Sequence, residues 1–228
     1  MNNLQRTVIP LMLLGDGQVG KTSLILRLTG NKFDDSLMTT IGKESSVYKV
    51  TLHGHELKMK IWDTAGQERF KSMTVNVIKS VDGLILVYSI DSEDSFKNID
   101  YWLKQLNDIS DISKKPIIIV GNKSDLNDLR KVSFEEGESF ARNHGYNFYE
   151  VSAKSGENVK EAFYDIFDQL YNLLKEEILN TTQIDDYSSL KIKPTKKKHC
   201  CWNKLLYYSK IIFLYYLKMK IKFCKIFK

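Results

Sequence analysis

A glycine-rich segment near the N-terminus has the residue types that bind phosphate. Residues Gly15–Thr22 read G-D-G-Q-V-G-K-T and match the pattern G-x-x-x-x-G-K-[ST] at every fixed position. Glycines let successive backbone N–H groups turn inward around phosphate oxygens, and a helix that begins there adds the positive end of its dipole. In this pattern Lys21 supplies charge to the β- and γ-phosphates and the Thr22 hydroxyl coordinates Mg²⁺. A glycine turn with a solvated lysine is the competing interpretation.

A second motif points to the base. The sequence Asn122-Lys123-Ser124-Asp125 directly follows the apolar run Ile117–Val120. Guanine presents N1–H and an exocyclic amine side by side, and adenine has no such donor pair. One carboxylate, Asp125, can accept both hydrogen bonds, and facing adenine it would lose these partners. An isolated N-K-x-D is usually an ordinary turn, but together with a phosphate-binding segment it predicts guanine.

A third motif follows another apolar run and has groups suited to the γ-phosphate. It reads Trp62-Asp63-Thr64-Ala65-Gly66-Gln67-Glu68. Asp63 is a candidate for the Mg²⁺ shell, in the manner of a Walker-B acid. The Gly66 N–H can meet a γ-phosphate oxygen, and the Gln67 side chain can orient an attacking water. The three motifs together predict hydrolysis of GTP with Mg²⁺.

Alternating apolar runs and helix-like stretches predict the elements that carry these motifs. The expected strands are Val8–Leu14, Val47–Leu52, Leu57–Trp62, Leu84–Tyr88, Ile117–Val120 and Phe148–Val151. The expected helices are Gly20–Thr29, Ser92–Ile109, Ser133–Asn143 and Asn158–Leu179, and Ser133 with Glu136 forms a capping box. Strands that are apolar throughout, without alternation of apolar and polar residues, are typically covered on both faces of the sheet. The pattern predicts an α/β fold, a six-stranded, mostly parallel sheet with helices on both faces.

Charge is unevenly distributed along the 228 residues. The whole chain carries +6, but the residues from Asn180 onward contain 12 Lys and two acids, so Met1–Leu179 sums to −4. A mildly acidic body argues against nucleic acid as a partner, and a basic tail favours an anionic membrane surface. All three cysteines lie in the tail, which is consistent with a cytosolic setting.

From about residue 4 to residue 179 the chain resembles a small GTPase of the Ras superfamily, most closely of its Rab branch. The resemblance is carried by the phosphate-binding segment, by Trp62–Glu68 with the flanking Arg69-Phe70, and by the base motif. It implies a switch that cycles between GDP and GTP in vesicle traffic, with slow hydrolysis accelerated by an activating protein. An exchange factor and effectors are the other implied partners, and a monomer is expected.

The resemblance also adds site residues. Thr40 matches a switch threonine that binds Mg²⁺, Phe33 matches an aromatic packed against the base, and Ser152-Ala153-Lys154 matches a loop that completes the base pocket. The implied catalytic residues are Gln67, Lys21 and Thr40, and the implied metal ligands are Thr22, Thr40 and Asp63. The full set expected to bind nucleotide is Gly15, Asp16, Gly17, Gln18, Val19, Gly20, Lys21, Thr22, Ser23, Phe33, Thr40, Gly66, Asn122, Lys123, Asp125, Ser152, Ala153 and Lys154.

The partner surface departs from the Rab pattern. Ser45 and Val77 stand where many Rabs present aromatic rings to effectors, and of that triad only Trp62 keeps its ring. The usual partner set is therefore in doubt. The alternative function is a GTP-bound scaffold that no longer cycles, against which the intact Gln67 and Thr40 argue.

The sequence predicts that the tail divides into a flexible basic linker, residues 180–199, and a segment with two adjacent cysteines followed by basic and apolar residues, residues 200–228. Cys200 and Cys201 have the form of a prenylated Rab ending, yet 27 residues follow them. Two explanations stay open. Translation is annotated past a true stop after Cys201, or the lysine-rich apolar segment lies on a membrane surface. Either way we expect a peripheral position on the cytosolic face of an endomembrane.

Overall fold

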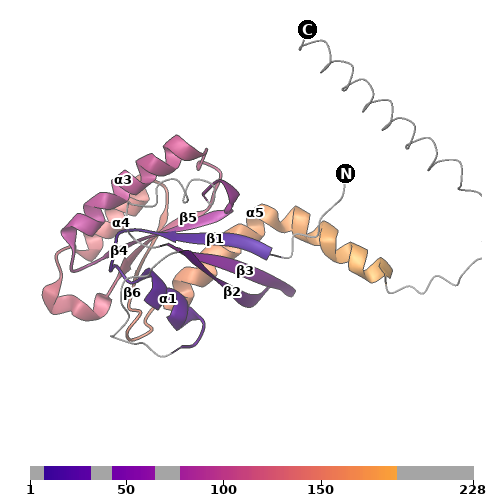
Figure 1. Cartoon of the computed structure of the whole chain (residues 1–228), viewed down its shortest axis with the longest axis horizontal. Coiled ribbons are helices and arrows are strands. Elements are labelled where there is room, and N and C mark those ends of the chain that lie inside the picture. Colours follow the sequence, from indigo (N-terminus) through magenta and orange to yellow (C-terminus); the bar gives the residue numbers. More distant parts are fainter. Residues whose placement is uncertain (1–7, 32–42, 65–77, 189–228) are drawn as a thin grey trace, which may run out of the picture. The chain divides into compact units, whose positions relative to one another are not determined.

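Six strands form one mixed sheet in the order β2-β3-β1-β4-β5-β6 (Figure 1). The computed structural model describes residues 8–31, 43–64 and 78–188. Only β2 runs antiparallel to its neighbour, and the other pairings are parallel. The strands are β1 (Val8–Leu14), β2 (Lys43–Leu52), β3 (His55–Thr64), β4 (Gly83–Ser89), β5 (Ile117–Asn122) and β6 (Asn147–Val151). The predicted fold class is confirmed.

Helices cover both faces of the sheet and form two apolar cores. Their bounds are α1 (Lys21–Leu28), α3 (Glu93–Ile109), α4 (Phe134–Asn143) and α5 (Val159–Ser188), with a 3₁₀ segment η2 (Ser124–Leu129). One core joins α1 and α5 to the sheet, and the other joins α3 and α4. Strands β4 and β5 are buried along their whole length, as their unbroken apolar sequence requires.

Local signals explain where two of these helices begin. The Ser92 side chain accepts a hydrogen bond from the Ser95 N–H and caps α3. The predicted capping box of α4 is confirmed, because the Ser133 hydroxyl accepts from the Glu136 N–H and the Glu136 carboxylate accepts from the Ser133 N–H. Both helices are therefore anchored at their N-termini by residues that the sequence identifies.

Two boundaries differ from the predictions by more than two residues. Strand β2 begins at Lys43 rather than Val47, because its polar first residues pair with the end of β3. Helix α5 continues past Leu179 to Ser188, so residues 180–188 of the predicted linker are helical. No Gly or Pro interrupts the chain there before Pro194, which removes the usual stop signals. Segment η2 was not predicted.

The strand order predicts a ligand crevice at the end of β1. The chain moves from β1 to one side of the sheet to build β2 and β3, and then to the other side to build β4, β5 and β6. Ligands of open α/β sheets bind outside the carboxyl ends of the strands where this direction changes. Within the described residues, no helix has the length and apolar character needed to cross a membrane.

Candidate nucleotide-binding site

The phosphate-binding segment lies between β1 and α1, in the crevice that the topology predicts. Gly15 has φ +146°, and a Cβ there would lie 2.0 Å from the Val87 carbonyl oxygen of β4. Gly20 has φ +93°, and a Cβ there would lie 2.3 Å from the Asn122 side chain. The two glycines are therefore required by neighbouring protein atoms, in addition to the approach of phosphate that the sequence suggests.

Gln18 of the phosphate loop adopts a left-handed conformation with φ +63°. Left-handed backbone costs a residue with a side chain roughly 1–2 kcal/mol. The Gln18 side chain is exposed, whereas the neighbouring Val19 is buried. The loop therefore holds strain at a position whose side chain faces solvent.

Lys21 lies inside the loop that precedes it. Its side chain is only 5% exposed, and its ammonium donates to the carbonyl oxygens of Gly15 at 2.9 Å and Asp16 at 2.6 Å. Burial lowers the pKa of the Lys21 ammonium to about 8, while the carboxylates of Asp63 and Asp16 oppose the shift. The loop thus surrounds a buried cation at the point where the motif predicts phosphate.

The two predicted metal ligands that the structure describes lie together. The Thr22 hydroxyl, in the first turn of α1, donates to the Asp63 carboxylate at the end of β3 over 2.6 Å. The two residues are 41 positions apart in sequence, and Asp63 is buried. A hydroxyl and a carboxylate beside a phosphate loop are hard oxygen donors, which suit Mg²⁺. These residues therefore fit the metal that the sequence predicts.

The base motif and the phosphate loop are joined through Asn122. This buried carboxamide donates to the Val19 carbonyl at 2.8 Å, and its oxygen accepts from the Ala153 N–H at 3.1 Å. Asn122 therefore connects three predicted nucleotide segments. Lys123 follows it with φ +68°, and its ammonium lies 3.4 Å from the Asp91 carboxylate.

The third predicted segment, Ser152-Ala153-Lys154, follows β6. The buried Ser152 hydroxyl donates to the Asp125 carboxylate at 2.6 Å and accepts from the Ser155 N–H at 3.0 Å. One oxygen of the predicted base-reading carboxylate is thus held by a loop 27 positions away in sequence. Ala153 is buried and Lys154 is exposed.

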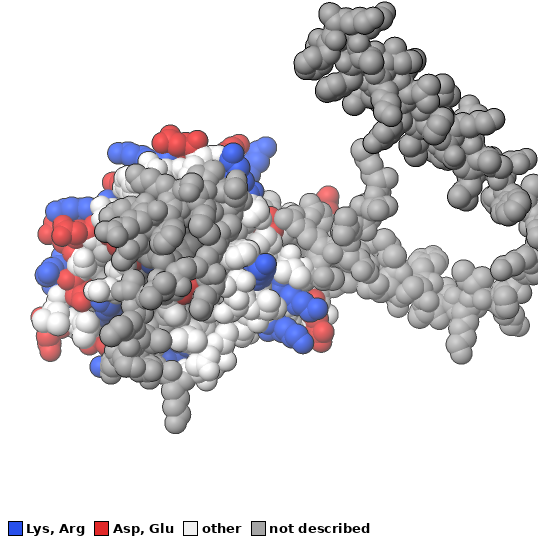
Figure 2. Space-filling view, viewed as in Figure 1, with Lys and Arg blue, Asp and Glu red and all other residues white. Residues whose placement is uncertain are grey.

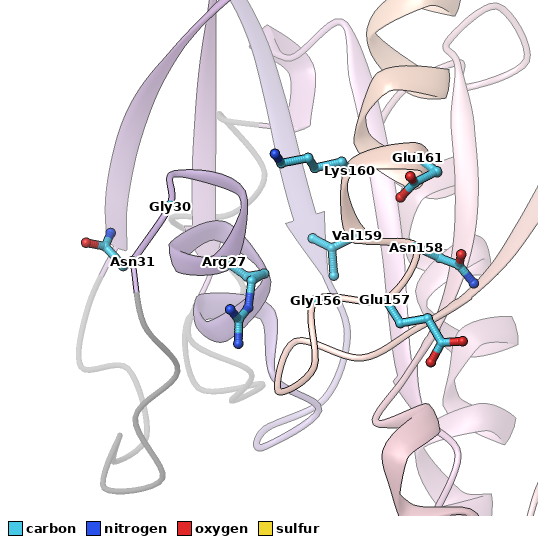
Figure 3. Close-up of a pocket in the computed structure, with 9 residues that line it drawn as sticks. All are labelled: Arg27, Gly30, Asn31, Gly156, Glu157, Asn158, Val159, Lys160 and Glu161. Atoms are coloured by element: carbon cyan, nitrogen blue, oxygen red, sulfur yellow. The ribbon is translucent and has the colours of Figure 1, made fainter.

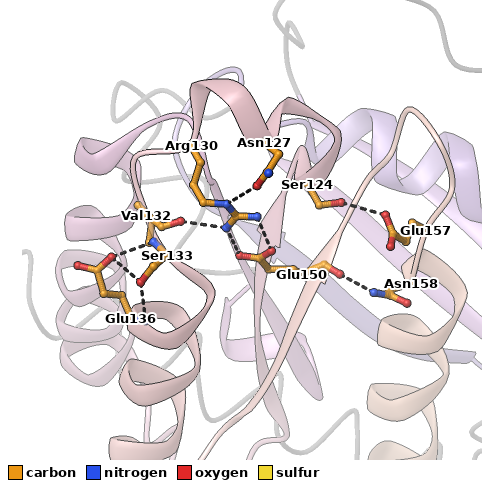
Figure 4. Close-up of polar contacts among 9 residues, drawn as sticks. All are labelled: Ser124, Asn127, Arg130, Val132, Ser133, Glu136, Glu150, Glu157 and Asn158. Atoms are coloured by element: carbon orange, nitrogen blue, oxygen red, sulfur yellow. Dashed lines mark hydrogen bonds and ion pairs between the residues drawn. The ribbon is translucent and has the colours of Figure 1, made fainter.

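A network of polar contacts supports these two base loops from outside (Figure 4). The Arg130 guanidinium, just after η2, binds both carboxylate oxygens of Glu150 in β6 at 2.6 and 2.9 Å. The Asn158 side chain donates to the Glu150 carbonyl at 2.9 Å. Glu150 lies in β6 two positions before Ser152. The Arg130–Glu150 ion pair therefore connects the segment that follows the base motif to the strand that leads into the Ser152–Lys154 loop.

Four supporting hydrogen bonds, which connect two pairs of segments, were not predicted. Asp16 accepts from the Asn98 side chain at 2.7 Å and from the Trp102 indole N–H at 3.0 Å, which joins the phosphate loop to α3. Arg27 of α1 donates to the carbonyl oxygens of Ala153, at 2.7 Å, and Lys154. No motif includes Asn98, Trp102 or Arg27. The only available signal was the i, i+4 spacing of Asn98 and Trp102 on one helix face.

The remaining site predictions divide into two groups. Gly17 lies in the phosphate loop and Ser23 in the first turn of α1. The others lie outside the described residues, namely Phe33, Thr40, Gly66, Gln67, Cys200 and Cys201. Val77 also lies outside them, while Ser45 is exposed on β2 directly opposite Trp62.

Comparison with known proteins identifies the family. A model described as Ras family matches residues 10–172. Ras-related protein Rab-13 of Mesocricetus auratus is 39% identical over 189 residues, which cover 83% of this chain and 92% of that relative. Ras-related protein Rab-8B of Homo sapiens is 37% identical over 190 residues, which cover 82% of this chain and 90% of that relative. The geometry of the loops agrees with these matches, and the chain belongs to the Ras family, as a small GTPase of the Rab branch.

Proposed function

We propose that this GTPase binds GTP through the loops at the carboxyl ends of β1, β3, β5 and β6, with the roles that the sequence predicts for their residues. As a Rab-branch protein it cycles between GDP and GTP, hydrolyses GTP with Mg²⁺ and regulates vesicle traffic. The observation that carries the assignment is the convergence of Lys21, Thr22 and Asp63 next to the Asn122 connection.

The phosphate end would work by charge and orientation. Lys21 and the loop amides neutralise the charge that develops on the phosphate oxygens, and Gln67 positions the attacking water. Thr22, Thr40 and Asp63 would hold Mg²⁺, which when bound adds positive charge at the β- and γ-phosphates. The protein supplies little covalent chemistry, so its work is to hold these groups in place before the reaction.

The base end would select guanine through Asp125. The Ser152 hydroxyl occupies one carboxylate oxygen, which holds the group in one orientation and leaves acceptor capacity for the base. A carboxylate prepared in this way favours the two adjacent donors of guanine and would lose partners against adenine. Phe33 and Lys154 are proposed to flank the base, and the other loop residues in the predicted set line the phosphates.

The metal assignment is tested with Thr22→Asn and the matched variant Thr22→Ser, which keeps the hydroxyl. Thr22→Asn removes the proposed Mg²⁺ ligand and should weaken Mg²⁺–GTP more than GDP, whereas Thr22→Ser should retain the original ratio. Equilibrium competition between the two nucleotides at fixed Mg²⁺ measures this. An unchanged GTP:GDP preference in Thr22→Asn would contradict the assignment.

Cycling, as opposed to a fixed GTP-bound scaffold, is tested by single-turnover hydrolysis. The protein loaded with radiolabelled GTP should release phosphate slowly, and Gln67→Leu should slow that release further. No measurable phosphate release by the wild type would favour the scaffold. The comparisons support a cycling GTPase with an exchange factor, an activating protein and effectors in general.

We further propose a monomer on the cytosolic face of an endomembrane, with Cys200 and Cys201 as lipid attachment sites and no nucleic acid partner. The basic tail supports attraction to anionic lipid. Mass spectrometry of the mature C-terminus tests the anchor. A lipidated peptide that ends at Cys201 would support this assignment, and recovery of unmodified peptides from residues 202–228 would contradict it.

A further inference from the structure

One arginine outside every motif contacts the base loop from the phosphate side of the site. Arg27 lies in the last turn of α1, the helix that begins with Lys21 and Thr22. Its Nε donates to the Ala153 carbonyl at 2.7 Å, and its Nη2 donates to the Lys154 carbonyl. Within the described residues, the guanidinium of Arg27 thus donates to main-chain carbonyls that lie 126 and 127 positions away in the sequence.

These bonds close a ring through the whole candidate site. The Ala153 N–H donates to Asn122, and Asn122 donates to the Val19 carbonyl in the phosphate loop. Helix α1 leads from that loop to Arg27, which returns to the Ala153 carbonyl. The N–H and the carbonyl of Ala153 are therefore held by side chains from two other elements, Asn122 at the end of β5 and Arg27 of α1.

The chain just after the base loop passes close to the Arg27 side chain at Gly156. Gly156 has φ +91°, and a Cβ at this position would lie 3.4 Å from Cδ and 3.7 Å from Nε of Arg27. Figure 3 shows Arg27 beside Gly156, at the wall of a cavity of about 510 Å³ that Asn31 and Lys160 also line. Two donors in a fixed fork reach two successive carbonyls, which a lysine ammonium cannot match in geometry.

We infer that Arg27 is a positioning residue that couples the phosphate loop to the base loop and thereby slows nucleotide release and sharpens base selection. The inference rests on the proposed nucleotide site. Arg27 keeps the Ser152–Lys154 loop in place, so Ser152 keeps its bond to Asp125. When the guanidinium is removed, the loop loses its connection to α1 while the Asn122 contacts remain.

The test measures dissociation of fluorescent GDP and fluorescent IDP from the full chain after a chase with excess unlabelled nucleotide. IDP lacks the exocyclic amine, so the ratio of the two rates reports how well Asp125 reads the base. The variants are Arg27→Met, which keeps the apolar stem, and Arg27→Lys, which keeps the charge. Arg142→Met is the matched control, because Arg142 is exposed on α4 and its side chain contacts Ser139 and Glu138 of the same helix.

Arg27→Met should release GDP roughly tenfold faster or more, the change expected from the loss of charge-assisted hydrogen bonds. It should also bring the GDP and IDP rates closer together. Arg27→Lys should lie between Arg27→Met and the wild type, and Arg142→Met should match the wild type. If Arg27→Met fails to fold, the inference is tested by comparing the GDP and IDP release rates of Arg27→Lys with those of the wild type.

Three results would overturn the inference. GDP release by Arg27→Met within twofold of the wild type would show that Arg27 does not hold the nucleotide. Faster release of GDP and IDP by the same factor would show general loosening without coupling to the base. Full retention of the wild-type release rates by Arg27→Lys would show that a positive charge is sufficient. It would therefore overturn the connection through two donors and two carbonyls on which the coupling rests. By contrast, a wild-type protein that releases GDP and IDP equally would refute Asp125 as the base reader, which is a failure of the proposed site itself.

Discussion

The loops at the carboxyl edge of the sheet and the outer face of the β2–β3 hairpin use polar residues in opposite ways. At the loops, Lys21, Asn122 and Ser152 are buried and make specific hydrogen bonds, Lys21 to the loop that precedes it and the other two to distant segments. Burial without such partners would cost the amide and the hydroxyl roughly 2–7 kcal/mol each, and the Lys21 ammonium far more. The loops are therefore ordered by the same contacts that make the burial possible.

On the hairpin, polar residues are exposed and some repel one another. Lys49 of β2 lies directly opposite Lys58 of β3, and both are exposed. Val47, 57% exposed, faces Lys60, whose ammonium lies 4.3 Å from the Trp62 ring centroid. Figure 2 shows lysine and arginine side chains gathered where Figure 1 draws this hairpin. Solvent screens such charges, so the fold tolerates the repulsion.

The largest expected effect comes from breaking the close packing of the phosphate loop. Gly15→Ala would place a Cβ against the Val87 carbonyl, so we expect a loss of about 2 kcal/mol or more of unfolding free energy, together with loss of GDP binding. The control is Gly54→Ala in the hairpin turn, where φ is +84° but no atom lies within 4 Å. It should cost only about 1 kcal/mol of backbone strain. Equal losses of unfolding free energy in the two variants, measured by urea denaturation, would contradict the expectation that the phosphate loop is more closely packed than the hairpin turn.

A smaller effect should follow from removal of the ion pair that supports the base loops. Arg130→Met leaves the Glu150 carboxylate, only 10% exposed, without its bidentate partner. We expect a loss of about 1–3 kcal/mol, below the value for a fully buried pair because Arg130 is 23% exposed. The double variant with Glu150→Met should recover part of the loss. Additive losses in thermal denaturation would show that the two side chains do not act as a pair.

The smallest effect has the opposite sign and comes from the hairpin. Lys49→Glu replaces a like-charged cross-strand pair with an opposite-charged one, and should stabilise the protein by about 0.2–1 kcal/mol. Lys49→Gln removes the repulsion alone and should gain less. Urea denaturation at low and high salt measures both, and the gain of Lys49→Glu should shrink in high salt. A gain that does not depend on salt would exclude an electrostatic cause.

Strand and helix positions were largely predictable, because apolar runs and caps are local signals. Strand β1 has its predicted bounds, and the Ser133 capping box appears as expected. The start of β2 was missed because Lys43–Ser46 has no apolar alternation, and its strand conformation comes from pairing with Trp62–Thr64. The extension of α5 to Ser188 has no signal in the sequence, because the apolar helical periodicity stops at about Leu179 and the residues that follow are polar.

The motifs alone determined the chemistry of this protein. A glycine-rich loop with Lys21 and Thr22, the acid Asp63 and the base motif ending at Asp125 have residue types that phosphate, Mg²⁺ and guanine require, whatever the rest of the chain does. Only the tertiary structure decided how these loops hold one another. Gly15 is required by a strand 72 positions away, and Arg27 reaches Ala153 across 126 positions. Such contacts leave no periodic or local pattern in the sequence, because they depend on which strands the sheet places side by side.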